Sequence, residues 1–205
     1  MGYLKNEFKL HMFGLRHDTI TKFYLSCFQK SQSVLPLLFI RIFIFLTCLA
    51  TIVISLVPPP ESDTQQRYWL IYMTNWGVVL INMTSGFAVI VSGIALFKVP
   101  FDATLKLPWY VKIYWVLFVT TVPVSVFITA FYYIMLFDSE VLTAGTPYYL
   151  AQDFLTHAVN SVLMLLLLIT SRTPFRILHF YFPVGIGLVY LIFSVIYYAA
   201  GGINQ

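Results

Sequence analysis

Residues 35–57, LPLLFIRIFIFLTCLATIVISLV, decide the fold class of this chain. The run is predominantly apolar and holds a single charged residue, Arg41. A helix needs about 20 consecutive apolar residues to cross the hydrocarbon core of a bilayer, and this run has that length. Three consecutive prolines, residues 58–60, follow it and end the helix. The run therefore predicts a transmembrane helix.

The composition of the whole chain agrees with a membrane protein. Of its 205 residues, 60% are hydrophobic and 10% are charged, and the mean hydropathy is +0.84. Soluble domains carry about 25% charged residues, so a soluble domain is excluded. We predict an all-α, polytopic transmembrane helix bundle. Its domain covers residues 35–200, with spans at 35–57, 69–97, 109–137, 154–170 and 178–200.

The lysine and arginine residues predict the orientation. The first 34 residues, together with the loops after the second and fourth spans, hold ten of the twelve cationic residues. Such residues are enriched on the cytoplasmic side. We therefore expect a multi-pass protein of the plasma membrane or endoplasmic reticulum, with residues 1–34 as a basic cytoplasmic segment. We interpret the pI of about 9.0 as this topology signal and as attraction to anionic lipid, and not as nucleic-acid binding.

Two features of the predicted cytoplasmic end concern contact with the membrane. Residues 19–28 place apolar side chains near one helical face, with lysines nearby, which predicts a short interfacial helix. Arg41 lies near the start of the first span. We expect its long side chain to snorkel to the cytoplasmic interface. Binding of a lipid head group or of a carbonyl-rich helix end is the alternative for this residue.

Thr74 and His157 are the candidate site residues, since a polar, titratable group inside a membrane span is by default a functional-site hypothesis. Thr74 is five residues past Trp69 and His157 is three past Phe154. At 1.5 Å per residue these offsets place them roughly 8 Å and 5 Å deep on the same side. A hydroxyl beside an imidazole can act as nucleophile and base. The structural alternatives are a threonine that bonds its own helix carbonyl and a histidine that hydrogen-bonds another helix.

Three further residues support this pair. Asp153 precedes His157 by four residues, and we interpret it chiefly as the N-cap of the fourth span, with orientation of the imidazole as the alternative. Asn160 shares a helical face with His157 at i+3 spacing. Asn75 and Asn160 can both serve as oxyanion donors, or they can serve in helix packing. The sequence has no metal-ligand spacing of Cys and His and no Gly-rich phosphate loop, so we expect no metal and no cofactor.

Three stretches resemble a known family. They are YMTNWG at 72–77, HAVNSVLM at 157–164 and GLVYLIFSVIYYAAGG at 187–202. These resemble the rolling stone family of insect membrane proteins linked to myoblast fusion, from about residue 20 to the C-terminus. Chains of that family continue past the last stretch into another span. We therefore expect this sequence, which stops at Gln205, to be a fragment or a shortened paralogue that lacks a sixth span.

The resemblance also implies an activity. The rolling stone family is remotely similar to the androgen-induced and androgen-dependent membrane proteins, which are threonine hydrolases of fatty acid esters of hydroxy fatty acids. Thr74 and His157 stand at the positions that match their catalytic threonine and histidine. The resemblance thus implies an intramembrane hydrolase that acts on fatty-acyl esters among membrane lipids. The alternatives are a non-enzymatic protein of cell–cell fusion and, less favoured, a transporter or channel.

Overall fold

The structure of the protein is a computed structural model that describes residues 10–57, 69–97, 107–137 and 147–202. Within these ranges the chain is helical without strands, which confirms the all-α prediction. Five helical segments are long and apolar enough to cross a membrane. The elements in chain order are η1 (Leu10–Phe13), η2 (Ile20–Phe23), α2 (Leu35–Leu56), α3 (Met73–Phe97), α4 (Trp109–Phe131), η4 (Tyr132–Leu136), α6 (Pro147–Phe154), η5 (Leu155–Val159), α7 (Asn160–Thr170), η6 (Ile177–Phe180) and α8 (Tyr181–Ala199).

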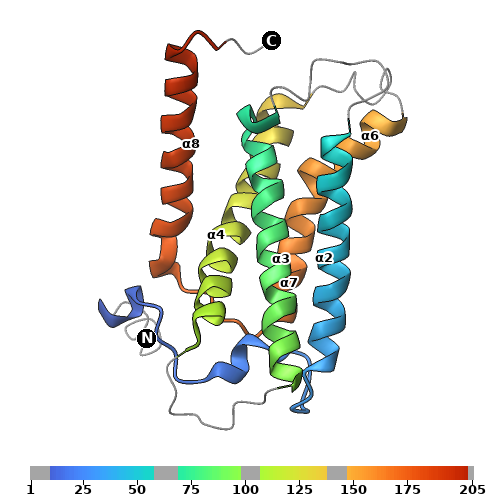
Figure 1. Ribbon diagram of the computed structural model, residues 1–205, viewed down its shortest axis with the longest axis vertical. Helices are drawn as coiled ribbons and strands as arrows, with labels where there is room; N and C mark the ends of the chain where they lie inside the picture. The colour runs from blue at the N-terminus through green and yellow to red at the C-terminus, as the bar shows by residue number, and fades with distance from the viewer. Residues whose placement is uncertain (1–9, 58–68, 98–106, 138–146, 203–205) are drawn as a thin grey trace.

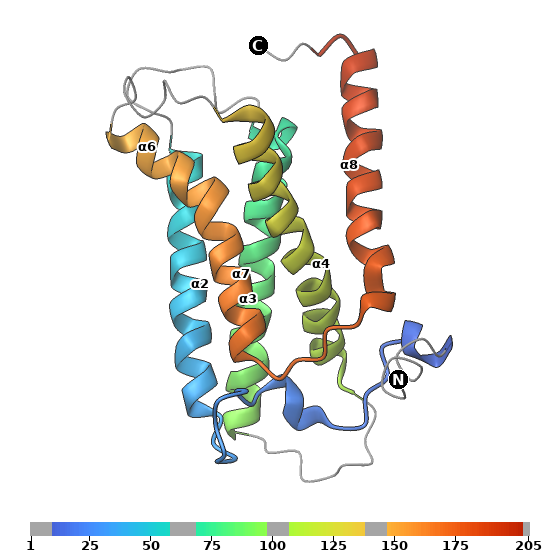
Figure 2. The same cartoon turned by 180° about the vertical axis from the view of Figure 1, so that it is seen from behind.

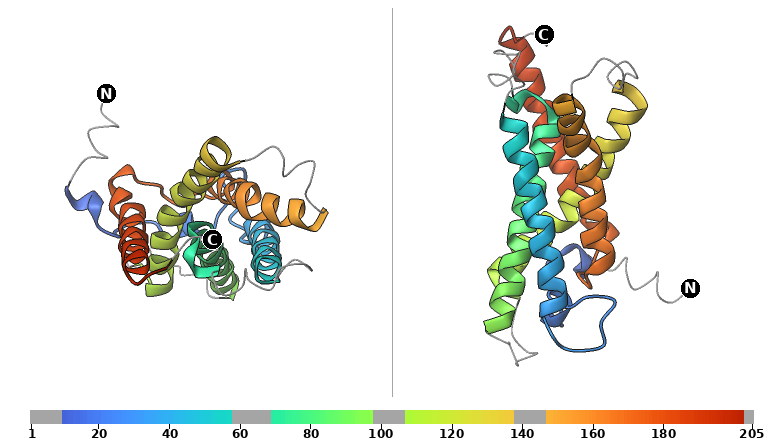
Figure 3. Two further views of the ribbon diagram at one scale, coloured as in Figure 1. Left: turned by 90° about the horizontal axis from the view of Figure 1, so that it is seen from above. Right: turned by 90° about the vertical axis from the view of Figure 1, so that its right-hand side faces the viewer.

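Four of the membrane segments form a bundle, and α8 stands beside it. Helix α2 packs on α3, α3 on α4 and α4 on α7, and α7 also contacts α2. Figure 1 shows α8 at the outside of this group, and Figure 3 shows the same arrangement from above. The core includes Tyr114, Trp115 and Phe118 of α4, which are fully buried. Helix α8 has no buried residue, and its Leu, Ile and Phe side chains are those that insert favourably into lipid.

The fourth membrane segment begins earlier than the sequence predicts. The apolar run indicates a helix over 154–170, whereas α6 already begins at Pro147. Helices α6, η5 and α7 form one membrane segment, Pro147–Thr170, whose α6 end leans outward from the bundle in Figure 2. Gln152 and Asp153 lower the hydropathy of this first part. An apolar run therefore does not reveal that this part is helical. The N-cap interpretation of Asp153 is wrong, because the residue lies inside α6.

The N-terminal segment packs against the end of the bundle. Only the single turn η2 is helical within residues 19–28, so the interfacial helix expected there is not formed. Phe23 is fully buried, and its ring packs edge-on against Trp115 with centroids 5.3 Å apart. The backbone N–H of Cys27 donates to the carbonyl of Thr170 at 2.9 Å. These contacts hold the segment to α4 and to the end of α7. The aromatic side chain of Phe23 therefore packs on protein and not on lipid.

Arg41 is fully buried, so the snorkelling interpretation is wrong. Its guanidinium donates hydrogen bonds to Ala88 O (3.1 Å), Ser92 Oγ (2.7 Å), Tyr114 OH (2.9 Å) and Ser171 Oγ (3.3 Å). The guanidinium carbon also lies 4.9 Å from the centroid of the Tyr114 ring. Among the described residues no carboxylate forms an ion pair with it. Arg41 therefore joins α2 to α3, α4 and the end of α7 through uncharged partners.

Candidate functional site

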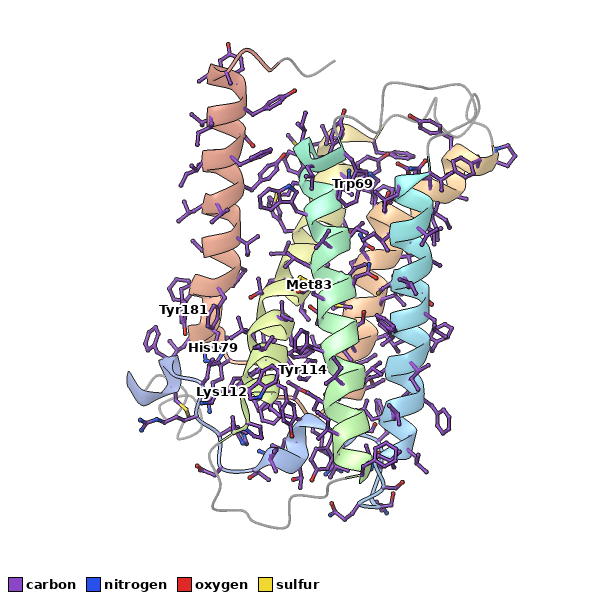
Figure 4. All side chains as sticks on the ribbon, viewed as in Figure 1. Trp69, Met83, Lys112, Tyr114, His179 and Tyr181 are labelled. Atoms are coloured by element: carbon purple, nitrogen blue, oxygen red, sulfur yellow. The ribbon has the colours of Figure 1, made fainter. Side chains whose placement is uncertain are left out.

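A cavity of about 370 Å³ lies at one end of the bundle, where α2 and η4 end, α3 begins and α6 crosses. Trp69, on its wall, is labelled in Figure 4 at the end of the molecule away from the N-terminal segment. The other lining residues are Ser55, Val57, Tyr72, Thr74, Asn75, Tyr132, Leu136, Tyr149, Gln152, Asp153, Thr156 and His157. The two residues singled out in the sequence, Thr74 and His157, therefore face one cavity. Four of the five candidate site residues line it.

The hydroxyl of Thr74 differs from the other aliphatic hydroxyls on the cavity wall. Ser55 donates to the carbonyl of Ile52 at 2.8 Å, and Thr156 donates to that of Gln152 at 2.9 Å. Thr74 makes no such bond within the part of the chain that the structure describes. It is the second residue of α3, and the carbonyls of Leu70 and Ile71, four and three residues before it, accept instead from Trp76 Nε1 and from the Tyr190 hydroxyl. Back-bonding to its own helix therefore does not explain Thr74, and its hydroxyl is available to a ligand.

The imidazole of His157 also lacks a hydrogen bond to another helix. Its Nδ1 is buried without a partner among the described residues. Its Nε2 lies 3.7 Å from Oδ1 of Asp153, which exceeds hydrogen-bond distance. The ring stacks on that of Tyr132, with centroids 3.5 Å apart and planes at 4°. Only the backbone carbonyl of His157 is bonded across helices, by the hydroxyl of Thr129. The structural alternative, in which the imidazole hydrogen-bonds another helix, is therefore not what the described residues show.

The carboxylate of Asp153 lies beside the imidazole of His157. It lies four residues before His157, and its Oδ1 accepts a hydrogen bond from the hydroxyl of Tyr132. The same oxygen is the one nearest to the imidazole. Within the described ranges no three His, Cys, Asp or Glu residues are grouped so that they could hold a metal ion. The titratable groups at the centre of the site are thus a carboxylate and an imidazole, with a tyrosine that contacts both.

The structure separates the two amides considered as oxyanion donors. Asn75 lines the cavity, and its Nδ2 donates to the carbonyl of Trp69 at 2.6 Å. An amide group carries two N–H donors, so one remains for a ligand. Asn160 is only 2% exposed, is not on the cavity wall, and donates to the carbonyl of Thr156. Asn75 is therefore placed to contact a ligand and Asn160 is not.

Two π-helical turns border the cavity. Tyr132 is the first residue of η4, and His157 is the central residue of η5. Such turns are rare and often occur at functional sites. The i→i+5 bonds of η5 also break the α-helical spacing that predicted a shared face for His157 and Asn160. Tyr132 was missed in the sequence because neither hydropathy nor periodicity distinguishes it from its neighbour Tyr133.

Comparison with known families adds to this geometry. A family model described as protein rolling stone matches residues 2–205. The chain belongs to the rolling stone family. Protein rolling stone of Drosophila melanogaster is 27% identical to it over 205 residues, which cover 94% of this chain and 70% of the fly protein. No solved structure matches the chain.

Membership in the rolling stone family confirms the resemblance that the three sequence stretches indicated. The matched range includes every described element of the bundle. It also includes all the residues of the cavity wall. The cavity is therefore part of the region that this chain shares with the rolling stone family.

Proposed function

We propose that this member of the rolling stone family is an intramembrane threonine hydrolase of fatty-acyl esters. Thr74 is the nucleophile, His157 is the general base, and the second N–H of Asn75 stabilises the oxyanion. The observation that carries the proposal is the Thr74 hydroxyl, which has no hydrogen bond to its own helix and lines the same cavity as the His157 imidazole. A hydroxyl needs an adjacent base to act as a nucleophile at neutral pH.

The reaction follows the two steps of acyl transfer. The Thr74 oxygen attacks the ester carbonyl carbon while its proton passes to His157, and Asn75 donates to the oxyanion. The carbon–oxygen bond to the alcohol then breaks, and His157 returns the proton to the leaving oxygen. In the second step His157 takes a proton from water, which attacks the Thr74 ester. The fatty acid leaves as the proton returns to Thr74.

The position of the cavity supports a lipid ester as substrate. Its wall includes Trp69, Tyr72, Tyr132 and Tyr149. Tryptophan and tyrosine are enriched at membrane–water interfaces because their rings are amphipathic. At that depth an acyl chain stays among lipid tails, while the ester and the attacking water both reach the polar wall. The proposal thus places the reaction at the bilayer surface.

We further propose that the cavity opens to the extracellular or lumenal side. Lys112, labelled in Figure 4, lies near the opposite end of the bundle from Trp69. The N-terminal segment and the α7–α8 connection, which are tied together, are basic as well. In sealed microsomes, protease should remove an N-terminal tag without detergent, because the basic end faces the cytosol. Protection of that tag until detergent is added would reverse the topology and place the cavity on the cytosolic face.

Covalent labelling tests the proposed nucleophile. Membranes that contain the protein are treated with an acyl-directed fluorophosphonate probe, and labelled protein is detected by gel fluorescence. We expect labelling of the wild type and none of Thr74→Ala, because the probe bonds to the activated hydroxyl. The matched control is Thr47→Ala, which removes a membrane threonine whose hydroxyl donates to Phe43 O in its own helix.

The result depends on how the three proteins compare at equal expression. Thr47→Ala should label as strongly as the wild type, since Thr47 is not part of the cavity wall. Equal labelling of wild type and Thr74→Ala would exclude Thr74 as the nucleophile. The same outcome would leave the non-enzymatic role in cell–cell fusion as the alternative.

A further inference from the structure

Tyr132 contacts both members of the acid–histidine pair. Its ring lies flat against the imidazole of His157, with centroids 3.5 Å apart. Its hydroxyl donates to Oδ1 of Asp153, the oxygen that lies 3.7 Å from Nε2 of His157. Asp153 and His157 come from the fourth membrane segment, whereas Tyr132 comes from η4 at the end of the third. The side chain of Tyr132, from the third membrane segment, thus contacts two side chains of the fourth.

The surroundings of the two ring nitrogens differ. A carboxylate oxygen lies near Nε2, and it stabilises a proton on that nitrogen. The buried Nδ1 has no acceptor among the described residues. A buried N–H donor without an acceptor is costly, so a proton on Nδ1 is disfavoured. Both arguments place the proton of the neutral imidazole on Nε2 and leave the lone pair on Nδ1.

We infer that Tyr132 is a positioning residue that, through Asp153 and by stacking, holds His157 as the Nε2–H tautomer with Nδ1 as its basic nitrogen. As a statement about catalysis, the inference rests on the proposed hydrolase function. The Thr74 hydroxyl and Nδ1 form no hydrogen bond in this structure, so in that reaction they first come within reach when the substrate binds. Nδ1 then accepts the Thr74 proton, and the imidazolium that forms lies between the Asp153 carboxylate and the Tyr132 ring face. Negative charge and an aromatic face both stabilise a cation.

Nitrogen NMR of the full-length protein in lipid bilayers tests the tautomer directly. The chain has four histidines, so ¹⁵N-histidine labelling gives few signals, and the loss of a pair in His157→Gln assigns those of His157. We expect the wild type to show a protonated Nε2 and an unprotonated Nδ1 near neutral pH. A wild-type spectrum with the proton on Nδ1 would overturn the inference.

Variants of Tyr132 separate its two contacts. Tyr132→Phe keeps the stacked ring but removes the donor that holds Oδ1 beside Nε2, so we expect a mixture of both tautomers. Tyr132→Leu removes both contacts and should give the mixture together with shifted ring signals. The matched control is Tyr133→Phe, because Tyr133 is the adjacent tyrosine and does not line the cavity. It should reproduce the wild-type spectrum.

Kinetics with p-nitrophenyl palmitate in mixed micelles provide the second measurement. We expect Tyr132→Phe to lower kcat by roughly 10- to 100-fold, the loss seen when a partner that orients a metal-bound histidine is removed, with KM nearly unchanged. A wild-type tautomer in Tyr132→Phe would overturn the positioning role whether or not the protein is a hydrolase. Signals of the other histidines report folding, and if Tyr132→Leu does not fold, Tyr132→Phe alone decides. The expected tautomers without turnover by the wild type would instead reject the hydrolase proposal.

Discussion

Thr74→Ala and His157→Ala are each expected to abolish hydrolysis of p-nitrophenyl palmitate by the purified protein. The alanine at position 74 removes the attacking oxygen, and the one at position 157 removes the group that takes its proton. Loss of a general base alone lowers kcat by roughly 100- to 10,000-fold. Because nucleophile and base act as one unit, the double variant should be scarcely worse than either single variant. Steady-state kinetics on the three variants measure this non-additivity.

Two further variants control this experiment. Thr74→Ser should retain part of the activity, because it keeps the hydroxyl and loses only a methyl group. Thr47→Ala should behave as the wild type, since its hydroxyl bonds within α2 and Thr47 does not line the cavity. Full turnover by Thr74→Ala at wild-type expression would disprove the catalytic role. Multiplicative losses in the double variant would mean that Thr74 and His157 act independently.

Among the substitutions proposed for this protein, Arg41→Ala is expected to cause the largest loss of stability. The change removes a fully buried guanidinium and leaves Ser92, Tyr114 and the carbonyl of Ala88 without their donor. Hydrogen bonds to charged groups contribute about 1.5–3 kcal/mol each, so the total loss should reach at least about 3 kcal/mol. For a chain of this size, that corresponds to a Tm lower by roughly 6–12 °C. Thermal unfolding in detergent measures the shift.

The controls for Arg41 distinguish geometry from charge. Arg41→Lys keeps the charge but cannot reproduce the fork of donors, so most of the loss should remain. Arg172→Ala removes an exposed arginine that donates to Gln29 O, and its Tm should change little. A Tm of Arg41→Ala within about 2 °C of the wild type would show that the network contributes little to stability, since 1 kcal/mol shifts Tm by about 2–4 °C at this size.

The membrane class, the five segments and two polar residues that line one cavity, Thr74 and His157, were predictable from the sequence. Within lipid every backbone polar group must be bonded internally, so about 20 apolar residues imply a helix whatever surrounds them. A threonine and a histidine inside such runs stand out for the same local reason. The residues up to and including Asp153 are more polar but still belong to the fourth membrane segment. Hydropathy alone therefore places the start of that segment too late.

Only the tertiary structure decided which side chains meet. The burial of Arg41 depends on hydroxyls that α3 and α4 bring to it, and Tyr132 reaches Asp153 and His157 from a separate membrane segment. The shared cavity of Thr74 and His157 likewise depends on how α6 crosses the bundle. Membrane helices associate through packing and hydrogen bonds, because lipid tails are as apolar as the side chains. Hydropathy therefore identifies the segments, but it carries no information about which faces of the segments come together.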